Sequence, residues 1–249
     1  MTNNEKLNGR VAVVTGASSG IGAATARRLA ADGARVAVLG RRKERIEELA
    51  AEFGAVAVVA DVADRDSVRD AAATVRAALG PVDLVVANAG VMLGAPFESA
   101  DAGEWDQMVG TNVTGLLYTA RAFVDDLLAA GREGRPADLV LVGSVGGHAV
   151  FPEYAVYAAT KAAVAHLTRN LRAEFGPRGV RVKNVEPGFV ATELGAGMRG
   201  TEQQAQLARW RSEMTILEPG DIAEAVAFAT SVPARLNVAE LILVPTQQG

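Results

Sequence analysis

The stretch Arg10-Val-Ala-Val-Val-Thr15-Gly16-Ala-Ser-Ser-Gly20-Ile-Gly22 decides the fold of this chain. It begins as a β-branched strand, turns through three glycines and continues into the alanine-rich segment 23–31, which favours a helix. Gly16 permits a tight turn, whereas Gly20 and Gly22 lack the Cβ that would keep a phosphate or a packed strand away. The unpaired N–H groups at the start of the helix attract an anion. The stretch therefore predicts a strand, a phosphate-binding turn and a helix.

The end of the second predicted strand, 34–39, indicates which dinucleotide is bound. An acidic residue about twenty positions beyond the glycines would accept hydrogen bonds from the ribose hydroxyls of NAD. This chain has Gly40-Arg41-Arg42 there instead, and guanidinium groups match the geometry of a 2′-phosphate. The pattern favours NADP. The alternative is that segment 41–48 is only the solvated, charged face of a helix.

Strands and helices alternate along the rest of the chain. Further strands are expected at 55–60, 82–86, 139–143, 179–186 and 240–244, and further helices at 65–79, 101–130, from Tyr157 to about 175, and at 221–231. This alternation predicts an α/β fold with a parallel sheet and helices on both faces. Strand five resumes directly after the polar turn 131–136, so residues 1–249 are expected to form one domain. Segment 189–214 is expected to be a mobile lid over the substrate cleft.

A serine, a tyrosine and a lysine are placed for proton transfer. Tyr157 and Lys161 are four residues apart in an alanine-rich run, so a helix sets both side chains on one face. A free tyrosine has a pKa of about 10, and a neighbouring ammonium lowers it. Ser144 follows a buried strand, where its hydroxyl could hold a carbonyl oxygen. The alternative without a catalytic role is that Lys161 is solvated and lies beside a half-buried Tyr157 ring.

Three more sites follow predicted strands or interrupt a predicted helix. Asp61 and Val62 follow the third strand, where the carboxylate could accept a hydrogen bond from an adenine amino group or cap the next helix. The small residues of Asn88-Ala89-Gly90 would let a cofactor pass closely over the sheet edge. Asn112 is a mediocre helix former inside a helix. It indicates either a surface position or a bend whose freed carbonyl holds a water.

Composition excludes several classes of function. The 249 residues include no cysteine, which removes disulfides, thiolate metal sites and cysteine nucleophiles. Two histidines far from any ligand spacing make a metal site unexpected. A formal charge of −4 does not indicate binding to nucleic acid or to an anionic membrane, which attract positively charged proteins. The polar N-terminus and the lack of a long apolar run lead us to expect a cytoplasmic protein without a membrane span.

Together these residues resemble the short-chain dehydrogenase/reductase family over nearly the whole chain. The matching motifs are Thr15-Gly16-x-x-x-Gly20-x-Gly22, Asn88-Ala89-Gly90, Asn112, Ser144, Tyr157-x-x-x-Lys161 and Pro187-Gly188. The resemblance implies a Rossmann-type doubly wound sheet of seven parallel strands in the order 3-2-1-4-5-6-7. It also implies a catalytic tetrad in which Ser144 orients the carbonyl and Tyr157 is the acid or base. In that scheme Lys161 lowers the Tyr157 pKa and binds the nicotinamide ribose, and Asn112 anchors a water.

The resemblance further implies a nicotinamide cofactor, with Val190 and Thr192 at its carboxamide. The expected cofactor-binding residues are Gly16, Ser18, Ser19, Gly20, Ile21, Gly22, Arg41, Arg42, Asp61, Val62, Asn88, Ala89, Gly90, Tyr157, Lys161, Pro187, Gly188, Val190 and Thr192. A narrower likeness is to the NADP-dependent branch that includes clavulanate dehydrogenase and the serine and allo-threonine 3-dehydrogenases. That branch usually has arginine before the final proline, where this chain has Val244. Whether this chain has a basic residue that anchors the tail or a carboxylate substrate is therefore an open question. Family members commonly form tetramers, so a homo-oligomer, tetramer or dimer, is expected.

The resulting hypothesis is an NADP(H)-dependent oxidoreductase that interconverts a carbonyl and an alcohol on a small to medium molecule. The alternative is a catalytically silent NADP-binding sensor or scaffold, which would have no need of Ser144 and Tyr157 together. The substrate cannot be named from the sequence.

Several other side chains have open roles. His148, Glu153, Tyr154 and Trp210 could meet a substrate or serve only the loops and the lid, and His166 is expected at a subunit contact.

Overall fold

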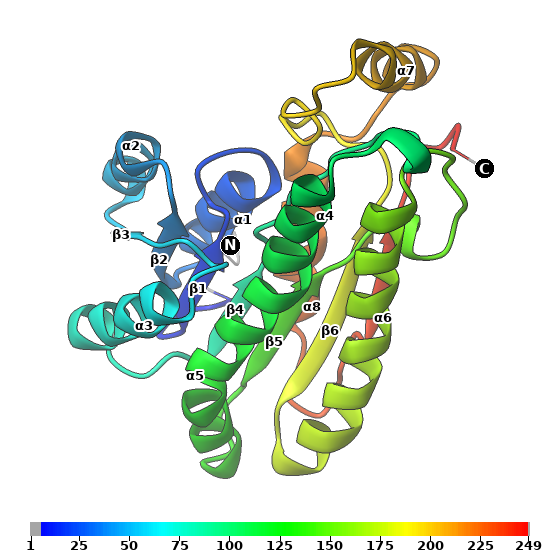
Figure 1. Ribbon diagram of the computed structural model, residues 1–249. Coiled ribbons are helices and arrows are strands. Elements are labelled where there is room, and N and C mark those ends of the chain that lie inside the picture. Colours follow the sequence, from blue (N-terminus) through cyan, green and yellow to red (C-terminus); the bar gives the residue numbers. More distant parts are fainter. Residues whose placement is uncertain (1–5, 249) are drawn as a thin grey trace.

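The computed structural model describes residues 6–248 and contains a seven-stranded parallel sheet in the order β3-β2-β1-β4-β5-β6-β7 (Figure 1). The strands are β1 Val11–Thr15, β2 Arg35–Gly40, β3 Val56–Val59, β4 Leu84–Ala87, β5 Asp138–Val142, β6 Arg181–Pro187 and β7 Glu240–Leu243. The order reverses direction between β1 and β4. This confirms the predicted Rossmann-type α/β fold and its strand order. Residues 1–5 of the polar N-terminal stretch lie outside the described part.

Helices cover both faces of the sheet. They are α1 Gly20–Ala31, α2 Lys43–Phe53, α3 Arg65–Leu79, α4 Ala102–Val109, α5 Gly115–Arg132, α6 Ala155–Phe175, α7 Thr201–Ser212 and α8 Pro219–Ser231. Helices α1, α2 and α8 share one hydrophobic core with the sheet, and α3, α5 and α6 share the other. Figure 1 shows α7 set apart from these layers.

The central strands supply both cores because they are buried on both sides. In β1, Val11 and Val13 belong to the core under α3, α5 and α6, whereas Ala12 and Val14 belong to the core under α1, α2 and α8. Alternate side chains of a strand point to opposite faces, so a continuous apolar run is what a sheet covered by helices on both faces requires. The short β-branched runs of the sequence therefore encode a sheet that lies between two layers of helices.

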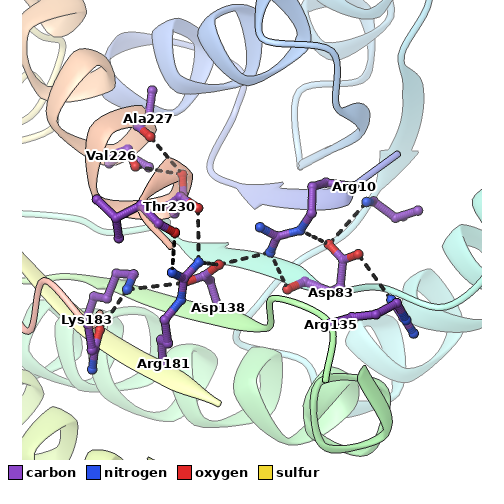
Figure 2. A network of polar contacts seen from close by, with 12 residues as sticks. Arg10, Asp83, Arg135, Asp138, Arg181, Lys183, Val226, Ala227 and Thr230 are labelled. Atoms are coloured by element: carbon purple, nitrogen blue, oxygen red, sulfur yellow. Dashed lines mark hydrogen bonds and ion pairs between the residues drawn. The ribbon is translucent and has the colours of Figure 1, made fainter. Parts of the chain in front are cut away.

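A buried network of charges joins the amino ends of four central strands (Figure 2). Asp138, the first residue of β5, accepts hydrogen bonds from Arg181 at 2.8 and 2.7 Å and from Arg10 at 2.9 Å, and it pairs with Lys183 at 3.1 Å. Arg10 also donates to Asp83 at 2.6 Å. Because these groups precede β1 and β4 or begin β5 and β6, the network fixes the end of the sheet opposite the loops that carry the predicted site.

The predicted lid contains regular structure. Residues beyond β6 include the twelve-residue helix α7, and the bridge between Val190 and Leu217 closes the excursion at its base. The helix places Leu207 and Trp210 against a cluster of apolar side chains that includes Tyr154 and Tyr157. The segment is therefore packed onto the rest of the protein at the carboxyl end of the sheet.

Candidate active site

A cavity of about 550 Å³ runs along the carboxyl ends of the strands. Its wall includes every predicted cofactor-binding residue except Gly22, together with Ser144, Tyr157 and Lys161 of the predicted tetrad. Asn112 lies behind the wall. Parallel α/β sheets bind ligands at the point where the strand order reverses, and the glycine-rich turn after β1 and Asn88 after β4 stand on the two sides of that point.

The glycine-rich turn has the shape that the sequence predicts. Gly16 has φ +65°, and a Cβ there would lie 2.7 Å from Cα of Ala89. Gly22 has a packing role, since a Cβ at this position would lie 2.5 Å from the carbonyl oxygen of Gly16 and 2.6 Å from Nδ2 of Asn88. Asn88 in turn donates a hydrogen bond to the Thr15 carbonyl at 3.0 Å. A side chain at Gly16 or Gly22 would therefore break the close packing of the turn against Asn88 and Ala89.

Arginines gather where β2 ends. Arg42 donates to the hydroxyls of Ser18, at 2.9 and 2.7 Å, and Ser19, at 2.6 Å. Arg41 lies 3.8 Å from the Asp61 carboxylate. The suggestion that Asp61 caps the next helix is wrong, because Asp64 caps α3 by accepting from the N–H groups of its first turn. Asp61 is thereby left on the cavity wall.

Ser144, Tyr157 and Lys161 meet on the wall of the cavity. The hydroxyl of Ser144 and the ring of Tyr157 both lie 3.4 Å from the point that a Cβ on Gly146 would occupy. Ser144 accepts a hydrogen bond from the Gly146 N–H at 3.0 Å and donates to the Pro187 carbonyl at 3.4 Å. The Lys161 ammonium lies 5.8 Å from the centre of the Tyr157 ring. One turn of α6 and the loop after β5 therefore bring the three groups together.

Burial controls the protonation of this group. It raises the pKa of the Tyr157 phenol, and a hydrogen bond with Ser144 offsets part of the increase. It lowers the pKa of Lys161 to about 8. Removal of water penalises both charged forms, so burial favours the neutral phenol of Tyr157 and the neutral amine of Lys161.

Asn112 lies in a distortion of a helix. A π-helical segment, Gly110–Thr114, joins α4 to α5, which agrees with the predicted bend. The Asn112 side chain accepts from the Val91 N–H at 2.8 Å and donates to the Val91 carbonyl at 2.9 Å and to Thr160 at 3.1 Å. Thr160 donates to the Tyr157 carbonyl at 2.6 Å. Asn112 thus ties the loop after β4 to the turn of α6 that carries Tyr157.

Aromatic side chains surround the part of the cavity beyond Tyr157. The Trp210 ring lies 5.9 Å from each of the rings of Phe151, Tyr154 and Phe189. Trp210 comes from the lid helix α7, and all four residues line the cavity. Tyr154 and Trp210, whose roles the sequence leaves open, therefore both lie on the wall of the cavity.

Other open positions have structural partners. His148 contacts both carboxylate oxygens of the buried Glu186, at 2.9 and 2.8 Å, and so ties the loop after Ser144 to β6. Glu153 accepts a hydrogen bond from Gln203 of α7 at 2.9 Å. His166 is exposed on α6. The His148 pair was not foreseen, because its members are 38 residues apart in the chain.

Sequence reasoning also missed polar residues at the cavity or next to it. Gln248, near the C-terminus, lines the cavity and accepts from the Phe189 N–H at 3.1 Å. Glu193 lines it too and pairs with Arg42 and Arg45. Arg45 belongs to the charged segment 41–48 and Glu193 to the lid segment 189–214, and no local pattern indicates that they meet.

Comparisons with known proteins agree with this geometry. The family model for short chain dehydrogenases matches residues 10–203. An uncharacterized oxidoreductase of Staphylococcus aureus strain USA300 is 36% identical over 242 residues, covering 96% of this chain and 98% of that protein. Among the described residues, no helix has the length and apolar character needed to span a bilayer.

Two solved structures are similar along almost their whole length. Serine dehydrogenase complexed with NADP+ has a TM-score of 0.88 at 32% identity and covers 96% of both chains. The 3-ketoacyl-(acyl-carrier-protein) reductase of Brucella melitensis complexed with NADH has a TM-score of 0.87 at 32% identity, with 95% of this chain and 97% of that chain covered. The glycine turn, the cavity and the matched sequence agree, and the chain belongs to the short-chain dehydrogenase family of oxidoreductases.

Proposed function

We propose that this protein is an NADP(H)-dependent oxidoreductase that interconverts a carbonyl and an alcohol on a small to medium molecule. The observation that carries the proposal is the meeting of Tyr157 and Ser144 on the wall of one cavity that also contains the glycine-rich turn. A proton donor, a second hydroxyl and a phosphate-binding turn in one cavity are what hydride transfer to a carbonyl requires of the protein.

Each polar group of the site has a definite task in this scheme. The Ser144 hydroxyl holds the carbonyl oxygen, and Tyr157 donates a proton to it during reduction or removes one from the alcohol during oxidation. Lys161 binds the nicotinamide ribose, and Asn112 positions the turn of α6 and anchors a water for proton exchange. The nicotinamide ring supplies or accepts the hydride when the cofactor is bound.

The cofactor assignment has two kinds of support. The cavity wall carries the glycine-rich turn with close backbone packing at Gly16, which suits a pyrophosphate. Similar structures contain NADP+ or NADH, so a nicotinamide dinucleotide suits this fold. The choice of NADP rests on Arg41 and Arg42 at the end of β2, since guanidinium groups pair with a 2′-phosphate.

The unit that performs this reaction is the single domain 1–249, with 189–214 as its lid. The aromatic cluster around Trp210 links that lid to the substrate end of the cavity. We also propose a homo-oligomer, dimer or tetramer, formed through α5 and α6. Light scattering of the purified protein tests this assembly.

A panel of aldehydes, ketones, hydroxy acids and quinones, followed by NADPH absorbance with NADH as the control, tests the function. We expect turnover of at least one carbonyl or alcohol, faster with NADPH. Tight NADPH binding without turnover across the panel would instead favour a silent nucleotide sensor. Failure to bind either dinucleotide would reject both.

A further inference from the structure

Glu193 connects the lid to the arginines at the end of β2. Its carboxylate accepts hydrogen bonds from Nη1 of Arg42 at 2.7 Å and from Nη1 of Arg45 at 2.7 and 3.0 Å. Glu193 is 151 residues from Arg42 in the chain and directly follows Thr192, the expected nicotinamide contact. One short loop segment therefore reaches from the nicotinamide end of the cavity to its adenosine end.

Hydrogen bonds hold the guanidinium of Arg42 in an orientation that leaves one nitrogen free to bind an anion. Its Nε and Nη2 groups donate to Ser18 and Ser19, which fixes the group over the glycine-rich turn. Its remaining nitrogen, Nη1, faces the Glu193 carboxylate. A carboxylate and a phosphate bind guanidinium through the same oxygen-to-nitrogen geometry. The carboxylate therefore occupies donors that a 2′-phosphate would use.

We propose that Glu193 is a specificity-determining residue that competes with the cofactor 2′-phosphate for Arg42 and Arg45. In the cofactor-free protein Glu193 holds both guanidinium groups, and a 2′-phosphate displaces it and takes both partners. Arg45 thereby becomes a phosphate ligand in addition to Arg41 and Arg42. This inference rests on the proposed use of NADP(H).

The exposure of the cluster makes such an exchange feasible. The side chains of Arg42, Arg45 and Glu193 are 42%, 48% and 50% exposed, so water solvates each group when it changes partner. The hydrogen bonds from Arg42 and then Arg45 lower the pKa of Glu193 to about 2. Glu193 is therefore an anion throughout the neutral range, and it repels a phosphate that approaches the same arginines.

Calorimetric titration with 2′,5′-ADP and with 5′-AMP tests the proposal without any catalytic turnover. The two probes differ only in the 2′-phosphate. The variants are Glu193→Gln, which removes the charge, and Arg45→Ala. The matched control is Glu202→Gln, which removes a negative charge from an exposed position of the same lid. Glu202 forms no ion pair with any of the described residues.

We expect Glu193→Gln to bind 2′,5′-ADP roughly three- to fivefold more tightly, the modest gain appropriate to an exposed, screened ion pair. Its affinity for 5′-AMP and both affinities of Glu202→Gln should stay at the parent values. Arg45→Ala should weaken binding of 2′,5′-ADP and leave the affinity for 5′-AMP unchanged.

The outcomes separate this inference from the proposed function. A parent protein that binds 2′,5′-ADP no better than 5′-AMP would overturn the NADP assignment and the competition with it. A preference for 2′,5′-ADP that Glu193→Gln leaves unchanged or weakens would reject only the role of Glu193. Equal changes for both probes would show that Glu193 affects the cavity in general and not the 2′-phosphate.

Discussion

The ammonium group of Lys161 donates a hydrogen bond of 2.9 Å to the backbone carbonyl of Val142, the last residue of β5. This bond joins α6, which carries Tyr157, to the strand that leads into Ser144. The nitrogen of the same ammonium group lies 5.8 Å from the centre of the Tyr157 ring. Lys161 is therefore a structural link between the two parts of the site.

Replacement of Tyr157 by phenylalanine removes the only hydroxyl that we assign to proton transfer. We expect turnover to fall at least about a hundredfold, the lower end of what a positioned proton donor contributes. Steady-state kinetics with NADPH and an accepted carbonyl measure this. Tyr118→Phe, on α5 and away from the cavity wall, is the control. Near-parent turnover in Tyr157→Phe would remove Tyr157 from the mechanism.

The pH profile should differ between the two directions of the reaction. Burial raises the pKa of Tyr157, so the phenol stays protonated through neutral pH and loses its proton only as pH rises through that raised value. Carbonyl reduction uses the protonated form and should be sustained at neutral pH. Alcohol oxidation needs the phenolate and should still be increasing at about pH 9, since an ordinary tyrosine titrates at about 10. A plateau of the oxidation rate below neutral pH would contradict this assignment.

Removal of Arg41 and Arg42 together should change cofactor selectivity. We expect Arg41→Ala/Arg42→Ala to weaken NADPH by about tenfold or more, because hydrogen bonds to a charged phosphate are lost, and to change NADH much less. Titration of each dinucleotide measures the two affinities. Arg69→Ala/Arg121→Ala makes the same change of charge at exposed positions on α3 and α5. An equal loss of affinity for both dinucleotides would show that the arginines do not read the 2′-phosphate.

The buried network at the amino ends of the strands should dominate stability. Asp138 is fully buried and pairs with Arg10, Arg181 and Lys183, so Asp138→Asn leaves these cations without their carboxylate. We expect a loss of at least about 3 kcal/mol in the free energy of unfolding. Asp125→Asn, which breaks an exposed pair with Arg121, should cost less than about 1 kcal/mol. Urea denaturation of both variants tests the difference, and equal costs would contradict the assigned role of the network.

Local chemistry along the chain is enough to predict several elements of the fold. The β-branched run 11–15 and the glycines after it encode a strand and a turn, because they limit backbone dihedral angles within a few residues. The spacing of Tyr157 and Lys161 placed both on one face of a helix for the same reason. The order of the strands followed from resemblance to a family, and the structure confirms it.

Contacts between residues far apart in the chain became visible only in the folded protein. Glu193 reaches Arg42 across 151 residues, and Asn112 holds Val91 and Thr160, from 21 and 48 residues away. No periodicity records such contacts, because they depend on the path of loops and on the packing of separate elements. The shifts in the pKa of Tyr157 and of Lys161 likewise follow from burial, which is a property of the assembled fold.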